Sequence, residues 1–310
     1  MTKFQGDNAT NLICFKYNFI LFSGWDGKVE ELYQSRQSPY LFGLGLEGFV
    51  KCLKIWNLDK KDKTSNSPEL VRCSRLTRAG NQAEPVTLAV SDNLHLLAVG
   101  YDDGAIVLHR GDVTKDSRSN KVKVLLEQGN SISGMSIRTT ESGTYLYVAS
   151  SEDVVMFNVS VKDRETRVVL DTVGCVKGLC VSPLSFNSET HFVTGQQDAV
   201  YCYNPEGRGQ CYAFEGKKRL IHWFRGYLTV ITEEGEEKAT ITVFDVQNKF
   251  IGFTAPIKPI LSVVSEWGSI FLISQEGKIH RLVEKDTQTK LEMLFKKNFY
   301  DGKMVEKQNV

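Results

Sequence analysis

Two adjacent acids, Asp102 and Asp103, stand out as side chains that could do chemistry, because paired carboxylates can hold a metal ion or act as acid and base. They lie between two glycines in the stretch LHLLAVGYDDGAIVLHRGD, with apolar runs on both sides. Similar turns recur with different acids at Glu152–Asp153, Gln197–Asp198 and Glu276. A metal site or a catalytic pair needs one fixed set of side chains. The recurrence therefore predicts that these acids form the corners of hairpin turns.

Other candidate sites have equally simple interpretations. GLGLEG at Gly43–Gly48 matches the glycine fingerprint of dinucleotide binding, but the strand pattern FVKCLKIWNL follows it where that chemistry needs a helix. Cys175 and Cys180 are separated by four residues, with no second pair or histidine nearby to complete a zinc site. The histidines are scattered singly along the chain, at His95, His109, His191, His222 and His280. The sequence predicts no catalytic, cofactor-binding or metal-ligating residues. Nothing in it argues for an enzyme, and we expect none.

Charge and composition narrow the possible partners. The 310 residues include 38 basic and 37 acidic side chains, a net charge of +1, which gives no long-range attraction for nucleic acid or an anionic membrane. The N-terminus is a poor secretory signal, no window has the ~18 apolar residues of a membrane span, and seven scattered cysteines suit a reducing compartment. We therefore expect a cytosolic chain. The acidic run Glu233–Lys238 is expected to be a solvated loop, with a docking site for a basic partner as the alternative. Lys217–Arg219 could contact an acidic partner.

The elements that carry these turns repeat along the chain. Each unit contains about four short segments rich in β-formers, and the second and third segments flank the turn. The last turn residue of each unit gives seven markers: Gly27, Gly48, Gly104, Asp153, Asp198, Gly235 and Gly277. Four strands recurring at this spacing are typical of a β-propeller. The sequence predicts an all-β fold, a WD40-like seven-bladed β-propeller over residues 1–286.

Two further features complete this prediction. The Trp-Asp dipeptide that ends the third strand of standard repeats is nearly absent; Ile55–Asn57 (IWN) and Val243–Asp245 (VFD) are the nearest matches. After Asp286 the spacing becomes helical, with Leu291, Leu294 and Phe295 on one face. Asp286 or Thr287 could cap that helix. We expect residues 287–310 to be the start of a truncated α-helical solenoid region.

Several segments carry a more specific likeness. IHWFRGYL (Ile221–Leu228), NPEGRGQCYAFEG (Asn204–Gly216) and LVEKDTQTKLEMLFKKN (Leu282–Asn298) are similar to the vacuolar protein sorting-associated protein 11 family. The likeness runs from about Leu32 to Asn298. It is most specific in the last segment, because the fold does not dictate those exposed polar residues.

The resemblance implies a propeller followed by an α-solenoid and a zinc-binding RING domain, whose cysteines and histidines have no counterparts here. It implies a non-catalytic scaffold, a class C subunit of the HOPS and CORVET complexes that tether endosomal, lysosomal or vacuolar membranes. Implied partners are the other class C subunits and, through the complex, Rab GTPases and SNAREs; the implied location is the cytoplasmic surface of late endosomes and lysosomes. Two alternatives remain: an unrelated propeller adaptor in coat assembly or ubiquitin ligation, and a propeller hydrolase or lyase.

The chain departs from the family pattern in two places. After SGWDGKV, Val29 leads directly to EELYQ, so the outer strand of blade one and the inner strand of blade two are expected to be missing. Beyond Asn298, FYDGKMVEKQNV departs from the expected helix, and Gly302 would weaken any continuation. We expect the first blades to be incomplete and the propeller to be less stable than a complete ring, because open strand edges invite aggregation.

Overall fold

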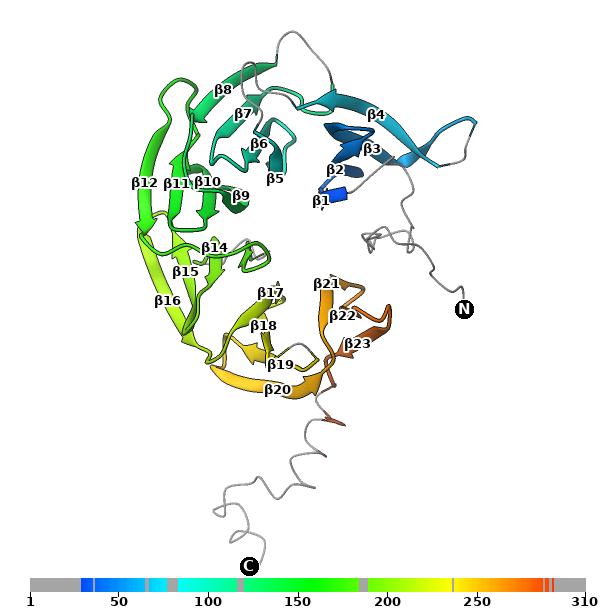
Figure 1. Ribbon diagram of the computed structural model, residues 1–310, viewed down its shortest axis with the longest axis vertical. Coiled ribbons are helices and arrows are strands. Elements are labelled where there is room, and N and C mark those ends of the chain that lie inside the picture. Colours follow the sequence, from blue (N-terminus) through cyan, green and yellow to red (C-terminus); the bar gives the residue numbers. More distant parts are fainter. Residues whose placement is uncertain are drawn as a thin grey trace, which may run out of the picture.

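The fold is a circular arrangement of small β-sheets around a common centre (Figure 1). The computed structural model describes residues 29–35, 37–64, 67–76, 83–115, 120–183, 189–235, 237–286, 288–289 and 292. Within these residues all the elements are β-strands, and every pairing within the sheets is antiparallel. The WD40-like propeller architecture is thus present.

Each sheet uses strands that are consecutive in the chain. The first three sheets contain β1 (Val29–Gln34), β2 (Tyr40–Glu47), β3 (Val50–Lys61) and β4 (Pro68–Arg75); β5 (Pro85–Val90), β6 (Leu96–Tyr101), β7 (Ile106–Arg110) and β8 (Lys121–Leu126); and β9 (Ile132–Thr140), β10 (Gly143–Ser150), β11 (Val154–Asn158) and β12 (Thr166–Asp171). The other three contain β13 (Cys180–Val181), β14 (Phe192–Gly195), β15 (Ala199–Asn204) and β16 (Gly207–Ala213); β17 (Lys218–Phe224), β18 (Tyr227–Glu233), β19 (Ala239–Asp245) and β20 (Phe250–Ile257); and β21 (Ile260–Glu266), β22 (Ser269–Ser274) and β23 (Ile279–Val283).

The described residues form six blades, and the prediction of seven is wrong. Six of the seven sequence markers fall at the connection between the second and third strands of a sheet, as the repeat pattern predicted. The marker at Gly27 belongs to residues 1–28, which lie outside the described part of the chain. Counting that marker as a complete blade produced the difference.

The expectation of a missing inner strand is also wrong. Val29–Gln34 forms β1, which pairs with β2 and completes a four-stranded first sheet. Its two adjacent acids, Glu30 and Glu31, made this segment a weak strand signal in the sequence. The outer strand predicted to be missing concerns residues 1–28 and lies outside the described residues.

The C-terminal helix is not present as an element in the described residues. The structure describes only 288, 289 and 292 beyond Asp286, and the backbone at these three positions is helical. The two Asp286 carboxylate oxygens accept hydrogen bonds from the Thr289 backbone N–H (2.8 Å) and hydroxyl (2.9 Å). This is the geometry of an N-cap. Leu291, Leu294 and Phe295, the predicted apolar face, lie outside the described residues.

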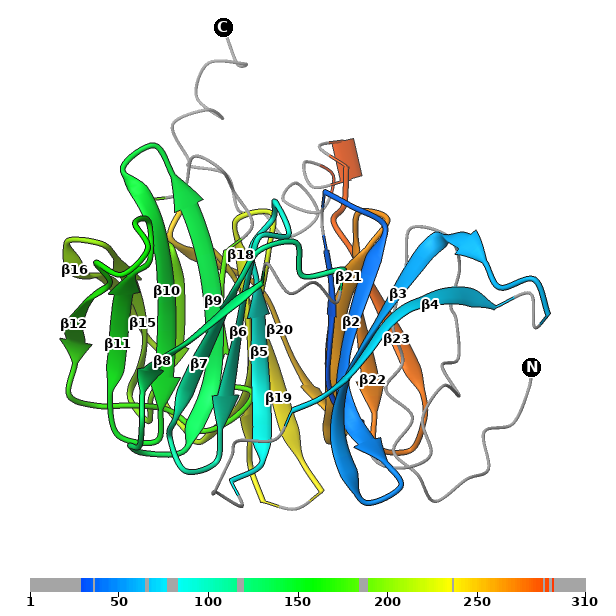
Figure 2. The same ribbon diagram turned by 90° about the horizontal axis from the view of Figure 1, so that it is seen from above.

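The innermost strands connect each sheet to the next. Contacts run from β1 to β5, β9, β13, β17 and β21 in turn. Seen from the side, the strands run along the central axis, so the turns gather at two opposite faces (Figure 2). The turns between second and third strands lie on one face, and those between first and second strands lie on the other, because the strands are antiparallel.

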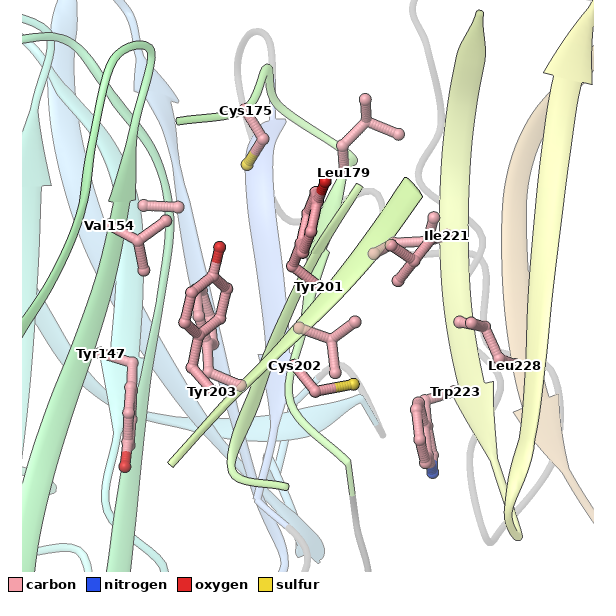
Figure 3. Close-up of a cluster of buried hydrophobic side chains, with 14 of the residues drawn as sticks. Tyr147, Val154, Cys175, Leu179, Tyr201, Cys202, Tyr203, Ile221, Trp223 and Leu228 are labelled. Carbon is pink, nitrogen blue, oxygen red and sulfur yellow. The ribbon is translucent and has the colours of Figure 1, made fainter. Parts of the chain in front are cut away.

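Apolar side chains between adjacent sheets form the core. In β15, Tyr203 points towards the sheet that carries Tyr147, and Cys202 points the other way, towards Trp223 (Figure 3). This alternation lets one strand fill the spaces on both sides of its sheet. The buried hydroxyls have partners, Tyr147 with His191 Nδ1 at 2.9 Å and Tyr203 with Asp171 Oδ2 at 2.8 Å. The buried face of a blade therefore holds aromatic rings whose polar ends are satisfied.

Candidate functional site

The turn acids have local structural partners. Asp102 Oδ1 accepts a hydrogen bond from the Glu84 backbone N–H at 2.9 Å, and Asp103 Oδ1 accepts one from the Ala105 N–H at 3.0 Å. Gly104 follows with a φ of +79°. In a later blade, Asp198 Oδ2 accepts a hydrogen bond from the Tyr201 hydroxyl at 3.0 Å. These side chains hold their turns together, which agrees with the interpretation of the acids as turn corners.

The GLGLEG segment lies in a hairpin. Its first residues belong to β2, Gly48 forms the turn with a φ of +60°, and β3 follows at Val50. The prediction of a strand after the glycines is confirmed. A helix N-terminus, which would face a pyrophosphate, does not follow the glycines in this part of the chain.

The basic cluster Lys217–Arg219 has two exposed side chains, Lys217 and Arg219, and one buried side chain, Lys218. Lys218 is buried, and its ammonium group donates to the carbonyl oxygens of Gln197 (3.0 Å), Phe214 (2.6 Å) and Gly216 (3.5 Å). Burial lowers the pKa of this amine. Its two neighbours instead lie close to Glu233 of the acidic run, each at 3.6 Å. The two charged runs thus partly neutralise each other within one blade.

Replacing Lys218 with methionine is expected to lower the free energy of unfolding by about 2–3 kcal/mol, because it removes a buried charged donor that three carbonyl oxygens share. Lys217→Met is the matched control, since the Lys217 side chain is 83% exposed and its ion pair with Glu233 lies at the surface. Urea denaturation of both variants measures the difference. Equal stability of the two variants would contradict the role assigned to Lys218.

A loop between β12 and β13 reaches the innermost strands of the first two sheets. The Lys177 ammonium donates to the carbonyl oxygen of Val86 at 3.2 Å and to that of Glu30 at 3.4 Å. Next to it, the half-buried Glu31 carboxylate accepts a hydrogen bond from the Leu88 N–H at 3.0 Å. Burial raises the pKa of Glu31, although Thr87, Lys177 and the Leu88 N–H act in the opposite direction.

Two thiols belong to the same central region. The Cys175 and Cys180 side chains interact, and this hydrogen bond together with burial raises the pKa of Cys180. A thiol with a raised pKa is a weak nucleophile. Glu31, in turn, is engaged with the backbone of β5. We term Glu31, Cys175, Lys177 and Cys180 the central cluster. The central cluster ties strands together, and its chemistry does not favour catalysis.

A small cavity of about 70 Å³ opens beside this cluster, between β1, β5 and β9. Its polar lining includes Glu31, Asp92 and Arg138, and Arg138 Nη1 donates to the Pro183 carbonyl oxygen at 2.9 Å. Sequence reasoning missed this grouping, because no motif connects residues so far apart in the chain. Across the described residues, no three His, Cys, Asp or Glu side chains are grouped so that they could hold a metal ion.

The histidines occupy different environments. His95 and His280 are exposed, whereas His191 binds the Tyr147 hydroxyl. His109 and His222 have buried Nε2 atoms without a hydrogen-bond partner in the described structure. The prediction that each histidine lies in a different blade is wrong for His95 and His109, which share the β5–β8 sheet; the other three are in three further blades.

The side chains at the Trp-Asp position accept hydrogen bonds from the backbone of the turn that follows the third strand. At the end of the IWN segment, Asn57 Oδ1 accepts hydrogen bonds from the backbone N–H groups of Asp59 (3.0 Å) and Lys60 (3.3 Å). At the end of the VFD segment, Asp245 Oδ1 accepts one from the Asn248 N–H at 2.9 Å. Both segments are in third strands, β3 and β19, as predicted.

Comparison with known proteins decides the family. A family model described as PEP5/VPS11 N-terminal matches residues 4–284. The chain belongs to the vacuolar protein sorting-associated protein 11 family. It is 38% identical over 301 residues to the homologue from Mus musculus, 37% identical over 301 residues to that from Homo sapiens, and 30% identical over 291 residues to that from Arabidopsis thaliana. These alignments cover 90%, 90% and 91% of this chain.

The chain spans about a third of the length of these family members, 31% of the mouse and human proteins and 29% of the Arabidopsis protein. The fold is shared more widely. A chain of a mitotic checkpoint complex structure superposes with a TM-score of 0.60 at 13% identity, covering 87% of this chain and 81% of that one. The WD40 propeller domain of Doa1 gives 0.54 at 12% identity, covering 84% of each chain. In the described part of the chain, no helix is long and apolar enough to cross a membrane.

Proposed function

We propose that this chain is a non-catalytic scaffold module of the class C tethering machinery, HOPS and CORVET, which docks endosomal, lysosomal or vacuolar membranes before fusion. The match of the PEP5/VPS11 N-terminal model to residues 4–284 carries this proposal. The geometry supports it: the turn acids and Lys218 hold the fold together. A propeller offers loops from every blade at its surface, which suits several simultaneous protein contacts.

The proposal includes a division of the chain and a location. Residues 1–286 form the propeller, and residues 287–310 begin an α-helical region. The partners are the other class C subunits, and Rab GTPases and SNAREs are reached through the complex. The module acts at the cytoplasmic surface of late endosomes and lysosomes, held there by these protein contacts.

Affinity purification tests the proposal. The tagged chain and a tagged full-length family member are expressed side by side, and the captured proteins are identified by mass spectrometry. We expect the full-length protein to recover the other class C subunits, and this chain to recover a subset of them. Recovery of no class C subunit with either would overturn the proposal, and recovery of coat or ubiquitin-ligase components in their place would favour the adaptor alternative.

A further inference from the structure

Two neighbouring hairpin turns carry unexpected residues. Arg225–Gly226 joins β17 to β18, and Trp267–Gly268 joins β21 to β22. The φ angles are +50° and +83° in the first turn and +46° and +73° in the second. Two central residues with positive φ define a type I′ turn, whose first position favours Asn, Asp or Gly. A bulky aromatic residue in this conformation is an outlier, and such strain persists where it has a use.

The two turn tips lie side by side. A Cβ atom on Gly268 would be 3.4 Å from Arg225 Nη1, so the arginine of one turn reaches the glycine of the other. Arg225 lies over the Phe224 ring at 5.1 Å, and Trp267 packs edge-on against Phe271 at 6.1 Å. Trp267 nevertheless remains 49% exposed. Together, Arg225–Gly226 and Trp267–Gly268 form what we term the tip pair.

The chain leaves the propeller next to the tip pair. Val283, the last residue of β23, pairs with Ser269, which directly follows the Trp267 turn. Glu284 Oε1 then accepts a hydrogen bond from the Tyr227 hydroxyl at 2.8 Å, and Tyr227 directly follows the Arg225 turn. Asp286 caps the backbone at Thr289. Figure 2 shows the last described residues, in red, leaving the upper face of the propeller at this point.

The residues that follow Asp286 have the apolar spacing of an amphipathic helix. A helix capped by Asp286 places Leu291 about 7.5 Å along its axis from the cap, with Leu294 and Phe295 on the same face. Such a face needs a partner to be stable in water, because short isolated helices are marginal. The indole of Trp267 is a large, half-exposed apolar side chain in the turn beside which the chain leaves the propeller.

We propose that the tip pair is the docking surface for the helix that begins at Asp286, with Trp267 packed against the face formed by Leu291, Leu294 and Phe295. This contact fixes the direction in which the helical region leaves the propeller. The inference rests on the proposed division of the chain at residue 286, and it is independent of which complex the protein joins.

Hydrogen–deuterium exchange in the full chain tests the contact. Trp267→Asn removes the indole but introduces a residue that a type I′ turn favours, so the propeller should stay folded. Lys249→Asn is the matched control, because Lys249 is exposed, has a φ of +57° and carries no ring. We expect amide exchange in residues 288–298 to become at least tenfold faster in Trp267→Asn and to stay within twofold of the unaltered chain in Lys249→Asn.

Leu294→Ser approaches the contact from the helix side and leaves the propeller sequence intact. We expect it to accelerate exchange in residues 288–298 as Trp267→Asn does, and the double variant to add little to either. Exchange in these residues that is unchanged by Trp267→Asn would overturn the proposal. So would exchange at the rate of an unstructured peptide in the unaltered chain. Neither result bears on affinity purification of class C subunits, so the two proposals fail independently.

Discussion

Replacing Gly104 with alanine is expected to lower the free energy of unfolding by about 3–4 kcal/mol. The φ of +79° alone costs an alanine about 1–2 kcal/mol. The new Cβ would also lie 2.2 Å from the backbone carbon of Gly129 and 2.6 Å from the carbonyl oxygen of Asn130. That backbone is held in place by a hydrogen bond from the Gly129 N–H to the Asp103 carbonyl oxygen at 2.9 Å. Forced overlap of this kind costs about 1–3 kcal/mol more.

Gly277→Ala is the matched control for this experiment. Gly277 occupies the same position in the last sheet, with a φ of +76°, and a Cβ there would meet no atom within 4 Å. We therefore expect only the conformational part of the cost, about 1–2 kcal/mol. Urea denaturation measures both variants. Equal losses would show that the approach of Gly129 to the turn does not restrict residue 104.

Acidification is expected to destabilise the protein by about 4 kcal/mol between pH 7 and pH 5 through two half-buried histidines, His109 and His222. Burial, with a smaller effect of Arg72, lowers the pKa of His109 to about 4, and burial lowers that of His222 to about 4. Each has a buried Nε2 atom with no hydrogen-bond partner in the described structure, so protonation would leave a charge without an acceptor.

The sign follows from proton linkage. Below pH 6.5 the unfolded chain binds a proton at each of these histidines, whereas the folded chain does so only near pH 4. Stability is therefore fully present above pH 6.5 and is lost as the pH falls towards 4. The loss is about 1.4 kcal/mol per pH unit for each group, or about 2 kcal/mol per histidine at pH 5.

A His109→Gln/His222→Gln variant tests this expectation. Its stability should fall by about 4 kcal/mol less than that of the unaltered chain between pH 7 and pH 5. Part of the loss should remain, because burial also lowers the pKa of His191. His280→Gln serves as the control, since that side chain is exposed. Parallel stability curves for the double variant and the unaltered chain would contradict the role assigned to His109 and His222.

The repeating part of the fold could be predicted because each blade is built from local signals. Alternating β-formers and a Gly or Asp turn recur, and every marker within the described residues falls at the predicted connection. Features that depend on contacts between blades could not be predicted. In the sequence, Lys218 looks like an ordinary surface charge. Its three carbonyl acceptors come together around it only in the folded chain.

The first blade shows the same limit. VEELYQ is a polar segment in the sequence, yet it forms the inner strand β1, because the Leu88 N–H of the neighbouring sheet donates a hydrogen bond to the half-buried Glu31 carboxylate. The contact from Lys177 to the carbonyl oxygens of Glu30 and Val86 joins residues that no local pattern relates. The central cluster was therefore missed, whereas the turn role of the acids could be inferred from their recurrence.

The consecutive order of the strands in every sheet has a consequence for synthesis on the ribosome. Each blade can pair its strands as soon as its own segment of about 50 residues has emerged, because it waits for no distant strand. Its apolar face stays uncovered until the next blade arrives, since the side chains of β15 pack against both neighbouring sheets. Nascent chains that stall between blades should therefore be the species that chaperones bind.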